Sequence, residues 1–367
     1  MEPIRLGLVG LGGMGKSHLA KETSLPEVRF VGVADVVRSA VDAASEQYGV
    51  PGFYGYQELI DRGECEAILI ATPHPFHAPI ALYAIERGLH VLTEKPIAVT
   101  VSEADAMVEA AARKGVKLGV MFQTRTESTM RRARELLAEG AIGRVYRSVV
   151  VASHWFRTQA YYDSGAWRGT WQGEGGGILM NQLPHTLDAF IWLGGKPSGV
   201  TARATTRGHR IEVEDTIEAL LDFTGDHTGY FYATTAEWPG EDRYEYTGDQ
   251  GKLVILDRQL RLYRLARTLS EEIATGGTWG KPEGAWETIE VPPESAGHAA
   301  VVAQFARAVR QGEPLVATGE DGRNALELAN ALMLSGFERR PVALPLDRAE
   351  YDRFLAAKRN EVAQPVR

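Results

Sequence analysis

The sequence predicts an α/β domain with a doubly wound parallel sheet, followed by an α+β domain with a large, open and mainly antiparallel sheet. In residues 1–125, short β-rich apolar runs alternate with segments of helical spacing, which is typical of a parallel sheet with crossover helices. A glycine-rich turn directly follows the first of these runs. In residues 126–367, several strands follow one another through short turns, which indicates antiparallel pairing. We therefore divide the chain into two domains, 1–125 and 126–367.

The elements of the first domain are predicted from its hydrophobic pattern. Its central strands are apolar on both faces, as a sheet covered on both sides requires. Ser102 with Asp105 fits a helix N-cap followed by an acidic residue in the first turn. Gly88 and Gly115 follow two helix ends, where a left-handed residue is favoured. Strands are expected at 4–9, 28–34, 67–71, 90–93 and 117–122, and helices at 17–24, 38–48, 78–87 and 102–114.

The second domain is expected to bind substrate and to form oligomers. Its stretch 155–177 is rich in tryptophan and glycine, and 274–284 is expected to be an irregular loop. The last two helices close the chain and could pack back on the first domain. Helices are expected at 129–139, from Gly177 to about Trp192, at 298–311 and at 320–334, and strands at 145–153, 198–206, 215–223, 229–235, 243–248, 252–256 and 259–263.

Composition and charge exclude several classes of protein. The chain has 367 residues and a formal net charge of −8, whereas nucleic-acid-binding proteins usually carry a basic excess. The single cysteine, Cys65, rules out an internal disulfide and a thiolate metal site. Glycines break the N-terminal apolar stretch, and no apolar run approaches the ~20 residues that span a bilayer. We therefore expect a cytoplasmic protein that binds neither nucleic acid nor a membrane.

The glycine-rich turn carries the pattern Gly10-x-Gly12-x-x-Gly15 directly after a strand. In such a turn the first glycine permits the tight bend, the second lets the backbone approach a pyrophosphate, and the third allows close packing of helix on sheet. The helix that starts near Gly13 offers unpaired N–H groups and a positive dipole end to the phosphates, with Met14 beside them. The turn is therefore a candidate dinucleotide site.

An acidic residue follows this turn at the distance that a dinucleotide site requires. Asp35 ends the second strand, twenty residues after Gly15, where an acid binds the ribose 2′-hydroxyl. Its charge would repel a 2′-phosphate and therefore favours NAD, while Arg38 lies close enough to leave NADP open. The constellation predicts a Rossmann domain that binds NAD.

Three further motifs carry a resemblance to a known family. TPxxxH spans 72–77, GxHVxxEKP spans 88–96, and GGGxxxNxxxHxxD spans 175–188. Together with the glycine turn, and over nearly the whole chain, they resemble the Gfo/Idh/MocA family of glucose–fructose oxidoreductases and inositol dehydrogenases. The sequence departs from the family pattern at His74, where Asn is common, and at Asn181, where Asp is common.

The resemblance implies roles for the residues of these motifs. Lys95, aimed into the cleft by a Pro96 that is often cis in the family, would polarise the substrate hydroxyl. His185 is the expected general base, because the pKa of histidine lies near working pH. Asn181 lies four residues earlier on the predicted helix, hence on the same face, and would orient the hydroxyl. Asp188 could orient His185 or serve packing, and no further ligand at metal spacing accompanies this pair, so we expect no metal.

The expected binding residues form two groups. Aromatic rings pack on the C–H faces of sugars while Arg and His bind hydroxyls, so the aromatic-rich stretch after His154 is expected to line a substrate pocket. Glycines 175–177 are expected to let the backbone pass close to a ligand. The cofactor is expected to contact Gly10, Gly12, Gly13, Met14, Gly15, Asp35, Arg38, Thr72, His74, His77, Glu94, Lys95, Gln123 and Arg168, and the substrate Lys95, His154, Trp155, Arg157, Tyr162, Trp167, Asn181 and His185.

These expectations define a leading hypothesis. It is an NAD-dependent oxidoreductase that moves a hydride between nicotinamide and a secondary alcohol of a sugar, glycoside or cyclitol. Three alternatives stay open: an enzyme that uses NAD transiently for glycoside cleavage or epimerisation, a trans-dihydrodiol dehydrogenase, and a non-catalytic NAD or sugar sensor. The open second sheet, with apolar positions alternating along many strands, also predicts a homodimer or homotetramer through that sheet.

Overall fold

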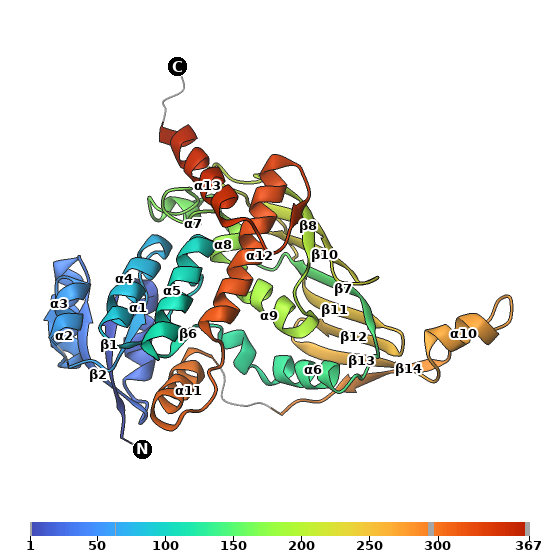
Figure 1. Cartoon of the computed structure of the whole chain (residues 1–367), viewed down its shortest axis with the longest axis horizontal. Coiled ribbons are helices and arrows are strands. Elements are labelled where there is room, and N and C mark those ends of the chain that lie inside the picture. Colours follow the sequence, from blue (N-terminus) through green and yellow to red (C-terminus); the bar gives the residue numbers. More distant parts are fainter. Residues whose placement is uncertain (1, 63, 293–296, 364–367) are drawn as a thin grey trace. The chain divides into compact units, whose positions relative to one another are not determined.

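The computed structural model describes residues 2–62, 64–292 and 297–363. The chain forms two compact units, each assembled from segments that are not contiguous in the sequence (Figure 1). The chain therefore passes repeatedly from one unit to the other. Unit 1 comprises Met1–Thr126, Gly173–Gly175 and Ser295–Leu326, and unit 2 comprises Glu127–Gln172, Gly176–Glu294 and Glu327–Arg367.

Unit 1 is built around a parallel sheet whose described strands have the order β3-β2-β1-β4-β5-β6. All of these pairs are parallel, and helices connect successive strands, so the predicted doubly wound fold is confirmed. The strands β1 and β4 are almost entirely buried, as a sheet covered on both faces requires. The strands are β1 (Ile4–Val9), β2 (Val28–Ala34), β3 (Gly52–Phe53), β4 (Ala67–Ile70), β5 (His90–Thr93) and β6 (Leu118–Val120), and the helices are α1 (Gly13–Glu22), α2 (Arg38–Tyr48), α3 (Tyr56–Asp61), η1 (His74–Phe76), α4 (His77–Glu86), α5 (Val101–Lys114) and η2 (Gln123–Thr126).

The start of α5 differs from its prediction. The helix begins at Val101 and its N-cap is Thr100, so the predicted cap, Ser102, is wrong. The Thr100 hydroxyl accepts the Glu103 N–H at 3.3 Å, and the Glu103 carboxylate accepts the Thr100 N–H at 3.1 Å. This reciprocal capping box satisfies two N–H groups that a helix start leaves unpaired, which Ser102 cannot do from inside the helix. At the other end, Gly115 is left-handed with φ +68°, as predicted.

A helix from the C-terminal part of the chain completes unit 1. This helix, α11 (His298–Gln311), contacts α1 and the strands β1, β2 and β5. Its residues Val302 and Phe305 belong to the same buried cluster as Leu6 and Leu69 of the sheet. Burying apolar surface contributes ~25 cal/mol per Å², so α11 is part of the hydrophobic core of unit 1.

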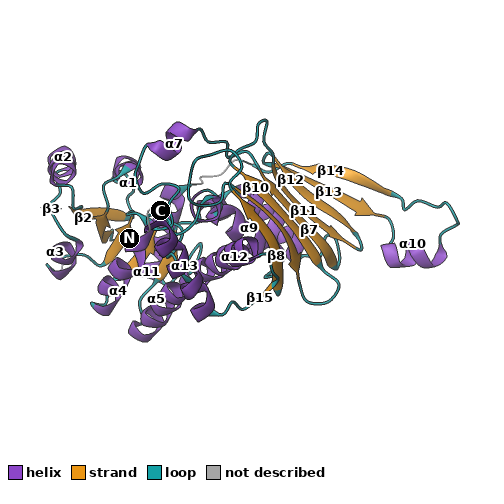
Figure 2. Ribbon diagram, turned by 90° about the horizontal axis from the view of Figure 1, so that it is seen from above, coloured by secondary structure: helices purple, strands orange, loops and turns teal. Residues whose placement is uncertain are grey.

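Unit 2 is built around a large sheet with the described strand order β14-β13-β12-β11-β7-β10-β9-β8-β15. The pair β7–β10 is parallel and the remaining pairs are antiparallel, which confirms the predicted, mainly antiparallel sheet. Figure 2 shows these strands side by side, with α9 against one face and α10 beyond the ends of β13 and β14. The strands are β7 (Val145–Ala152), β8 (Gly199–Thr205), β9 (Thr216–Asp222), β10 (Thr228–Thr234), β11 (Asp242–Gly248), β12 (Gly251–Leu256), β13 (Gln259–Leu265), β14 (Gly284–Ile289) and β15 (Val342–Ala343), and the helices are α6 (Ser128–Ala138), α7 (Gln159–Asp163), α8 (Ile178–Asn181), α9 (Pro184–Gly194), α10 (Leu269–Thr275) and α13 (Arg348–Ala363), while α12 (Gly319–Glu338) crosses the division between the units.

The C-terminal part of the chain contains one more helix than predicted. A further helix, α13, follows the two predicted C-terminal helices, so these do not close the chain. Its Phe354 ring packs edge-on against Trp171, and Phe337 of α12 packs against the same tryptophan. The tryptophan therefore belongs to the aromatic core of unit 2. No helix in the described part of the chain is long and apolar enough to cross a membrane.

Candidate active site

The glycine turn between β1 and α1 contains two kinds of glycine. Gly10 has φ +100°, and a Cβ atom there would meet the Ala71 carbonyl oxygen at 2.5 Å. A Cβ atom on Gly15 would meet the Gly10 carbonyl oxygen at 1.9 Å, so α1 packs too closely for a side chain. By contrast, a Cβ atom on Gly12 or Gly13 would meet nothing within 4 Å. Packing within the protein therefore requires glycine at positions 10 and 15 but not at positions 12 and 13.

A bound dinucleotide would account for the glycines that packing leaves unexplained. Gly12 is the N-cap of α1, where backbone N–H groups without helical partners favour an anion. Asp35, after the end of β2, is held beside this turn, because its carboxylate accepts the Leu11 N–H at 2.6 Å and the Val37 N–H at 2.8 Å. The open space and the nearby carboxylate fit the pyrophosphate and ribose of NAD.

Two further predicted cofactor residues are exposed near this turn. Met14 lies in the first turn of α1, with 40% of its surface exposed. Arg38 begins α2, and its guanidinium carbon lies 4.3 Å from the centroid of the Tyr54 ring. This cation–π contact holds the arginine side chain against an aromatic face.

The histidines of the segment 72–77 are buried and face backbone oxygen atoms. His77 places Nδ1 2.8 Å from the Pro96 carbonyl oxygen and Nε2 2.8 Å from the Thr72 carbonyl oxygen. It thereby joins the loop after β4 to the loop after β5. His74 Nδ1 lies 3.2 Å from the Glu174 carbonyl oxygen. Because His77 has no exposed surface, any role toward a cofactor would pass through the two loops that it joins.

The segment after β5 carries the candidate catalytic lysine. The Lys95–Pro96 peptide bond is cis, as the resemblance implies. The buried Glu94 carboxylate accepts the Lys95 N–H at 3.2 Å, and the Glu94 N–H donates to the Ile70 carbonyl oxygen at 2.8 Å. The backbone at Lys95 is therefore tied both to the neighbouring side chain and, through Glu94, to the end of β4.

A histidine outside the predicted motifs holds Glu94 in place. His18 of α1 places Nε2 2.9 Å from Glu94 Oε1 and Nδ1 2.8 Å from Glu22 Oε1. Burial alone would lower the pKa of His18, but the hydrogen bonds to the two carboxylates raise it to about 9. The spacing of His18 and Glu22, four residues apart on one helix, is the signal in the sequence that could have revealed this pair. Among the described residues, no group of three or more His, Cys, Asp and Glu side chains could hold a metal ion.

The second glycine cluster serves packing within the protein. Gly175 has φ +77°, and a Cβ atom there would meet Cγ1 of Val99 at 2.2 Å. A Cβ atom on Gly177 would meet the Glu214 carbonyl oxygen at 1.8 Å. The Glu214 carboxylate also accepts the Gly177 N–H at 2.9 Å and the Leu179 N–H at 3.1 Å. Close approach to Val99 and Glu214 is therefore enough to explain the glycines at 175 and 177, and approach to a ligand stays a prediction.

Asn181 and His185 do not lie on one helix, so the prediction of a shared helical face is wrong. The short helix α8 ends at Asn181, and α9 begins at Pro184. Proline has no N–H for the preceding turn and its ring clashes there, which interrupts a continuous helix. Asn181 and His185 are both half-buried, whereas Asp188 is buried. The sequence spacing alone therefore does not define how these two side chains face one another.

The stretch after β7 contains buried polar atoms that have no hydrogen-bond partner within the described part of the chain. Nε1 of Trp155 and Nε of Arg157 have no hydrogen-bond partner among the described residues. The Arg157 guanidinium carbon lies 5.4 Å from the Trp155 ring centroid and 4.9 Å from that of Tyr161. His154 Nδ1 lies 3.9 Å from Asp242 Oδ1. Buried donors without partners are uncommon in folded proteins, and a ligand rich in hydroxyl groups would satisfy them.

An Asp–His pair that the sequence motifs did not reveal supports this stretch. Asp215 Oδ2 lies 2.9 Å from His209 Nδ1, and His209 Nε2 lies 2.9 Å from the Arg157 carbonyl oxygen. The Tyr162 ring packs on His209 with centroids 4.7 Å apart, and its hydroxyl lies 3.0 Å from Thr235 Oγ1. Burial alone would raise the pKa of Asp215, but hydrogen bonds from backbone N–H groups and side chains lower it. The carboxylate thus anchors two predicted substrate residues through one histidine.

Trp167 and Arg168 form a stacked group with Tyr161 in unit 2. The guanidinium carbon of Arg168 lies 4.4 Å from the Trp167 ring centroid and 4.5 Å from that of Tyr161. Its Nη1 donates to the Tyr161 hydroxyl at 2.7 Å. Arg168 therefore lies in unit 2 with the predicted substrate residues other than Lys95. The other predicted cofactor residues, including Gln123 of η2, belong to unit 1.

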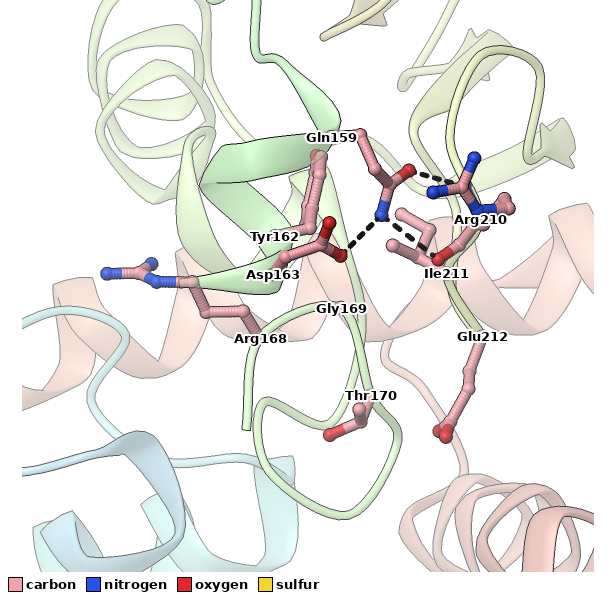
Figure 3. Close-up of a pocket in the computed structure, with 9 residues that line it drawn as sticks. All are labelled: Gln159, Tyr162, Asp163, Arg168, Gly169, Thr170, Arg210, Ile211 and Glu212. Carbon is pink, nitrogen blue, oxygen red and sulfur yellow. Dashed lines mark hydrogen bonds between the residues drawn. The ribbon is translucent and has the colours of Figure 1, made fainter. Parts of the chain in front are cut away.

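A pocket of about 430 Å³ opens in unit 2 beside this group (Figure 3). Tyr162 and Arg168 line it, whereas the predicted catalytic residues do not. The Gln159 amide donates to Asp163 Oδ1 at 2.8 Å and accepts the Arg210 N–H at 2.9 Å. Pockets of this size hold small molecules, and the polar lining suits hydroxyl groups. The lining residues are Gln159, Tyr162, Asp163, Arg168, Gly169, Thr170, Arg210, Ile211 and Glu212.

Two protein-family models match the chain. Residues 4–122 match the model GFO_IDH_MocA, described as an oxidoreductase family with an NAD-binding Rossmann fold. Residues 130–254 match the model of the GFO/IDH/MocA C-terminal domain. The two matches fall on the parallel sheet of unit 1 and on much of the large sheet of unit 2.

Individual relatives span most of the chain. Inositol 2-dehydrogenase of Rhizobium meliloti (strain 1021) is 25% identical, over 93% of this chain and 99% of its own. Trans-1,2-dihydrobenzene-1,2-diol dehydrogenase of Mus musculus is 32% identical, over 62% of this chain and 67% of its own. The crystal structure of the WlbA dehydrogenase from Bordetella pertussis, in complex with NADH and UDP-GlcNAcA, has a TM-score of 0.80 at 28% identity, covering 94% of this chain and 100% of that one.

Proposed function

Because the chain belongs to the GFO/IDH/MocA family of oxidoreductases, we propose that it is an NAD-dependent dehydrogenase of a secondary alcohol in a sugar, glycoside or cyclitol. The observation that carries the proposal is the open space beside Gly12 and Gly13 at the N-terminus of α1, in a turn whose other glycines serve packing. The inositol 2-dehydrogenase and the nucleotide-sugar complex among the relatives support the substrate class. When bound, NAD supplies the atom that accepts or returns the hydride.

The roles proposed for the reacting groups follow from their chemistry. Lys95 donates a hydrogen bond to the substrate oxygen and, as a cation, stabilises the negative charge that develops on it. His185 takes the hydroxyl proton, because imidazole can accept a proton near neutral pH. Asn181 cannot take a proton, so its amide orients the substrate hydroxyl. The half-buried position of both side chains leaves them accessible to a substrate.

NAD is proposed as the preferred cofactor over NADP. Asp35 holds a carboxylate beside the glycine turn, and its charge would repel a 2′-phosphate. Arg38, which could attract that phosphate, is in contact with the Tyr54 ring. An activity ratio that favours NADP would contradict this part of the proposal and would leave the substrate class unchanged.

We further propose that the protein is a cytoplasmic homodimer or homotetramer. Leu220 and Tyr230 are cross-strand partners on the large sheet, with exposed fractions of 63% and 39%. Apolar side chains gathered on an open sheet face favour burial against a second copy of the chain. The cytoplasmic location is supported by the single cysteine, Cys65, which is a buried free thiol.

The proposal is tested by measuring NADH and NADPH formation with cyclitols, free sugars, glycosides and trans-dihydrodiols. Lys95→Met is expected to lower turnover at least about 100-fold, because the polarising cation is lost. His185→Asn is expected to do the same, because it removes the base. Lys281→Met, at an exposed lysine of unit 2, is the matched control and should leave turnover unchanged.

Each result of this test has a separate meaning. Full turnover by Lys95→Met would remove that residue from the mechanism. Tight NAD binding by the wild type without turnover of any panel member would favour a sensor. Turnover confined to the dihydrodiols would favour the activity named for the mouse relative.

A further inference from the structure

Unit 1 contains a buried ionic cluster behind the two segments that would hold the cofactor and the reacting lysine. His18 is 1% exposed, Glu22 is 0% exposed and Glu94 is 5% exposed. The ring of His18 lies between the two carboxylates, 2.8 Å from Glu22 Oε1 and 2.9 Å from Glu94 Oε1. Glu22 and His18 are on α1, whereas Glu94 directly follows β5. The cluster therefore connects the helix of the glycine turn to the residue before Lys95.

The hydrogen bonds define the charge of this histidine. A neutral imidazole carries one N–H donor, whereas two carboxylates that both face ring nitrogens require two donors. The imidazolium form supplies both. Burial alone would raise the pKa of Glu94, but the hydrogen bond to His18 lowers it to about 2. The cluster therefore places the His18 ring between two buried acidic side chains, an arrangement that favours the imidazolium form.

The second carboxylate oxygen of Glu94 connects the cluster to the backbone of Lys95. Glu94 Oε1 faces His18, and Oε2 accepts the Lys95 N–H at 3.2 Å. Without the imidazolium, Glu94 would be a buried carboxylate that has lost its nearest cation, and burying an uncompensated charge is costly. The carboxyl group would then take up a proton or move, and either change alters its hydrogen bond to Lys95.

Other charged groups face the cluster from the elements around it. His298, at the start of α11, places Nε2 3.8 Å from Glu94 Oε1, and its ring lies edge-on to that of His18 with centroids 5.5 Å apart. Burial lowers the pKa of His298, so it is the weaker cation of the two. Lys95 follows Glu94, and Lys21 lies on α1 near His298.

We propose that His18, as an imidazolium between Glu22 and Glu94, is a positioning residue that fixes the backbone of Lys95 relative to α1. The proposal rests on the dehydrogenase function proposed above. His18 acts through Glu94, not through contact with substrate. The proposal predicts that the charge of His18 controls the chemical step, in which Lys95 polarises the substrate oxygen. It also predicts that a change of this charge leaves the binding of NAD and substrate largely intact.

The first test replaces the charge with a neutral amide in His18→Gln. We expect kcat to fall about tenfold or more, because small displacements of a reacting group are costly, with KM for substrate and Kd for NAD changed less than about threefold. The matched control is His90→Gln, since His90 begins the same strand and accepts the Lys117 N–H at 2.9 Å. The control should keep wild-type kcat. A folded His18→Gln protein with kcat within twofold of wild type would overturn the proposal.

The second test works even where His18→Gln fails to fold. Glu22→Gln keeps the shape of that side chain and removes one of the two charges that favour the imidazolium. We expect the loss of kcat at alkaline pH to begin at lower pH than in the wild type. The imidazole ¹⁵N signal of His18, identified by sequential assignment of the backbone, should titrate at the same lower pH.

The outcomes separate this inference from the proposed function. A wild type that binds no NAD and turns over no alcohol would defeat the proposed function, irrespective of the His18 titration. The positioning role alone would be defeated if the wild type is active and the His18 signal of Glu22→Gln titrates at lower pH, but the pH profile of kcat stays unchanged in that variant. An unchanged His18 titration in folded Glu22→Gln would also defeat the positioning role, because Glu22 would then not influence the charge of His18.

Discussion

A Cβ atom added to Gly15 would lie 1.9 Å from the carbonyl oxygen of Gly10, whereas one added to Gly12 would touch nothing. We therefore expect substitutions in this one turn to separate effects on folding from effects on cofactor binding. We expect Gly15→Ala to lower the free energy of unfolding by ~3 kcal/mol or more, because the backbone must move. Gly12→Ala should change it by less than ~1 kcal/mol but weaken NAD binding at least about tenfold. Thermal melts of the cofactor-free protein and titration calorimetry with NAD measure the two effects, and equal NAD affinity in Gly12→Ala would contradict the assignment.

The His18–Glu94 pair predicts a pH dependence of stability. The folded-state pKa of His18, about 9, is above its ordinary 6.5, so its contribution is complete below pH 6.5 and is lost as pH rises to about 9. The folded-state pKa of Glu94, about 2, is below its ordinary 4.5, so its contribution is present above pH 4.5 and is lost as pH falls to about 2. The difference in unfolding free energy between wild type and His18→Gln should therefore shrink by roughly 3 kcal/mol from pH 6 to pH 9. Urea denaturation at both pH values measures it, and a constant difference would show that His18 is not charged.

The Asp215–His209 pair predicts a variant that impairs substrate binding without touching the cofactor. Asp215→Asn removes the charge that faces His209, whose other nitrogen faces the Arg157 carbonyl oxygen. We expect KM for the substrate to rise about fivefold or more while Kd for NAD stays the same, because the stretch after β7 loses its anchor. Steady-state kinetics and calorimetry separate the two. Asp222→Asn, at an exposed position on β9, is the control and should match the wild type.

The exposed face of the large sheet predicts an effect on assembly. Leu220→Lys places a charge on the cross-strand pair with Tyr230 and should shift the protein toward the monomer in light scattering coupled to gel filtration. Val36→Lys is the control, because Val36 is even more exposed, at 85%, and belongs to unit 1. An unchanged molar mass in Leu220→Lys would place the subunit interface elsewhere or remove it.

Much of unit 1 could be predicted because its signals are local. The alternation of apolar runs with helical spacing predicted the central strands, and the three glycines with Asp35 predicted the turn for which we propose cofactor binding. The two-residue strand β3 could not be found in this way, since it exists through its pairing with Val33 and Ala34. The cap of α5 was misassigned because two neighbouring residues, Thr100 and Ser102, can both cap a helix, and only the partner three residues on decides between them.

The candidate site was harder to predict because its supporting contacts are distant in sequence. Asp215 and His209 reach Arg157 across some fifty residues, and no spacing rule connects them. Pro184, in contrast, was a visible signal that a helix through Asn181 and His185 would break. The glycines 175–177 show that one signal can have two explanations, because neighbouring protein atoms already require the small residues whose presence predicted a ligand nearby.

The helix α11 has a consequence for how the protein is made. Val302 and Phe305 of this helix share a buried cluster with Leu6 and Leu69, although the rest of the sheet is complete by residue 120. A ribosome that has delivered the six strands must therefore produce almost two hundred more residues before the sheet gains this cover. During that interval the nascent sheet exposes an apolar surface, and unit 2 is being synthesised meanwhile. An N-terminal fragment cut at Thr126 would keep that surface bare, so unit 1 is complete only after most of unit 2 has been synthesised.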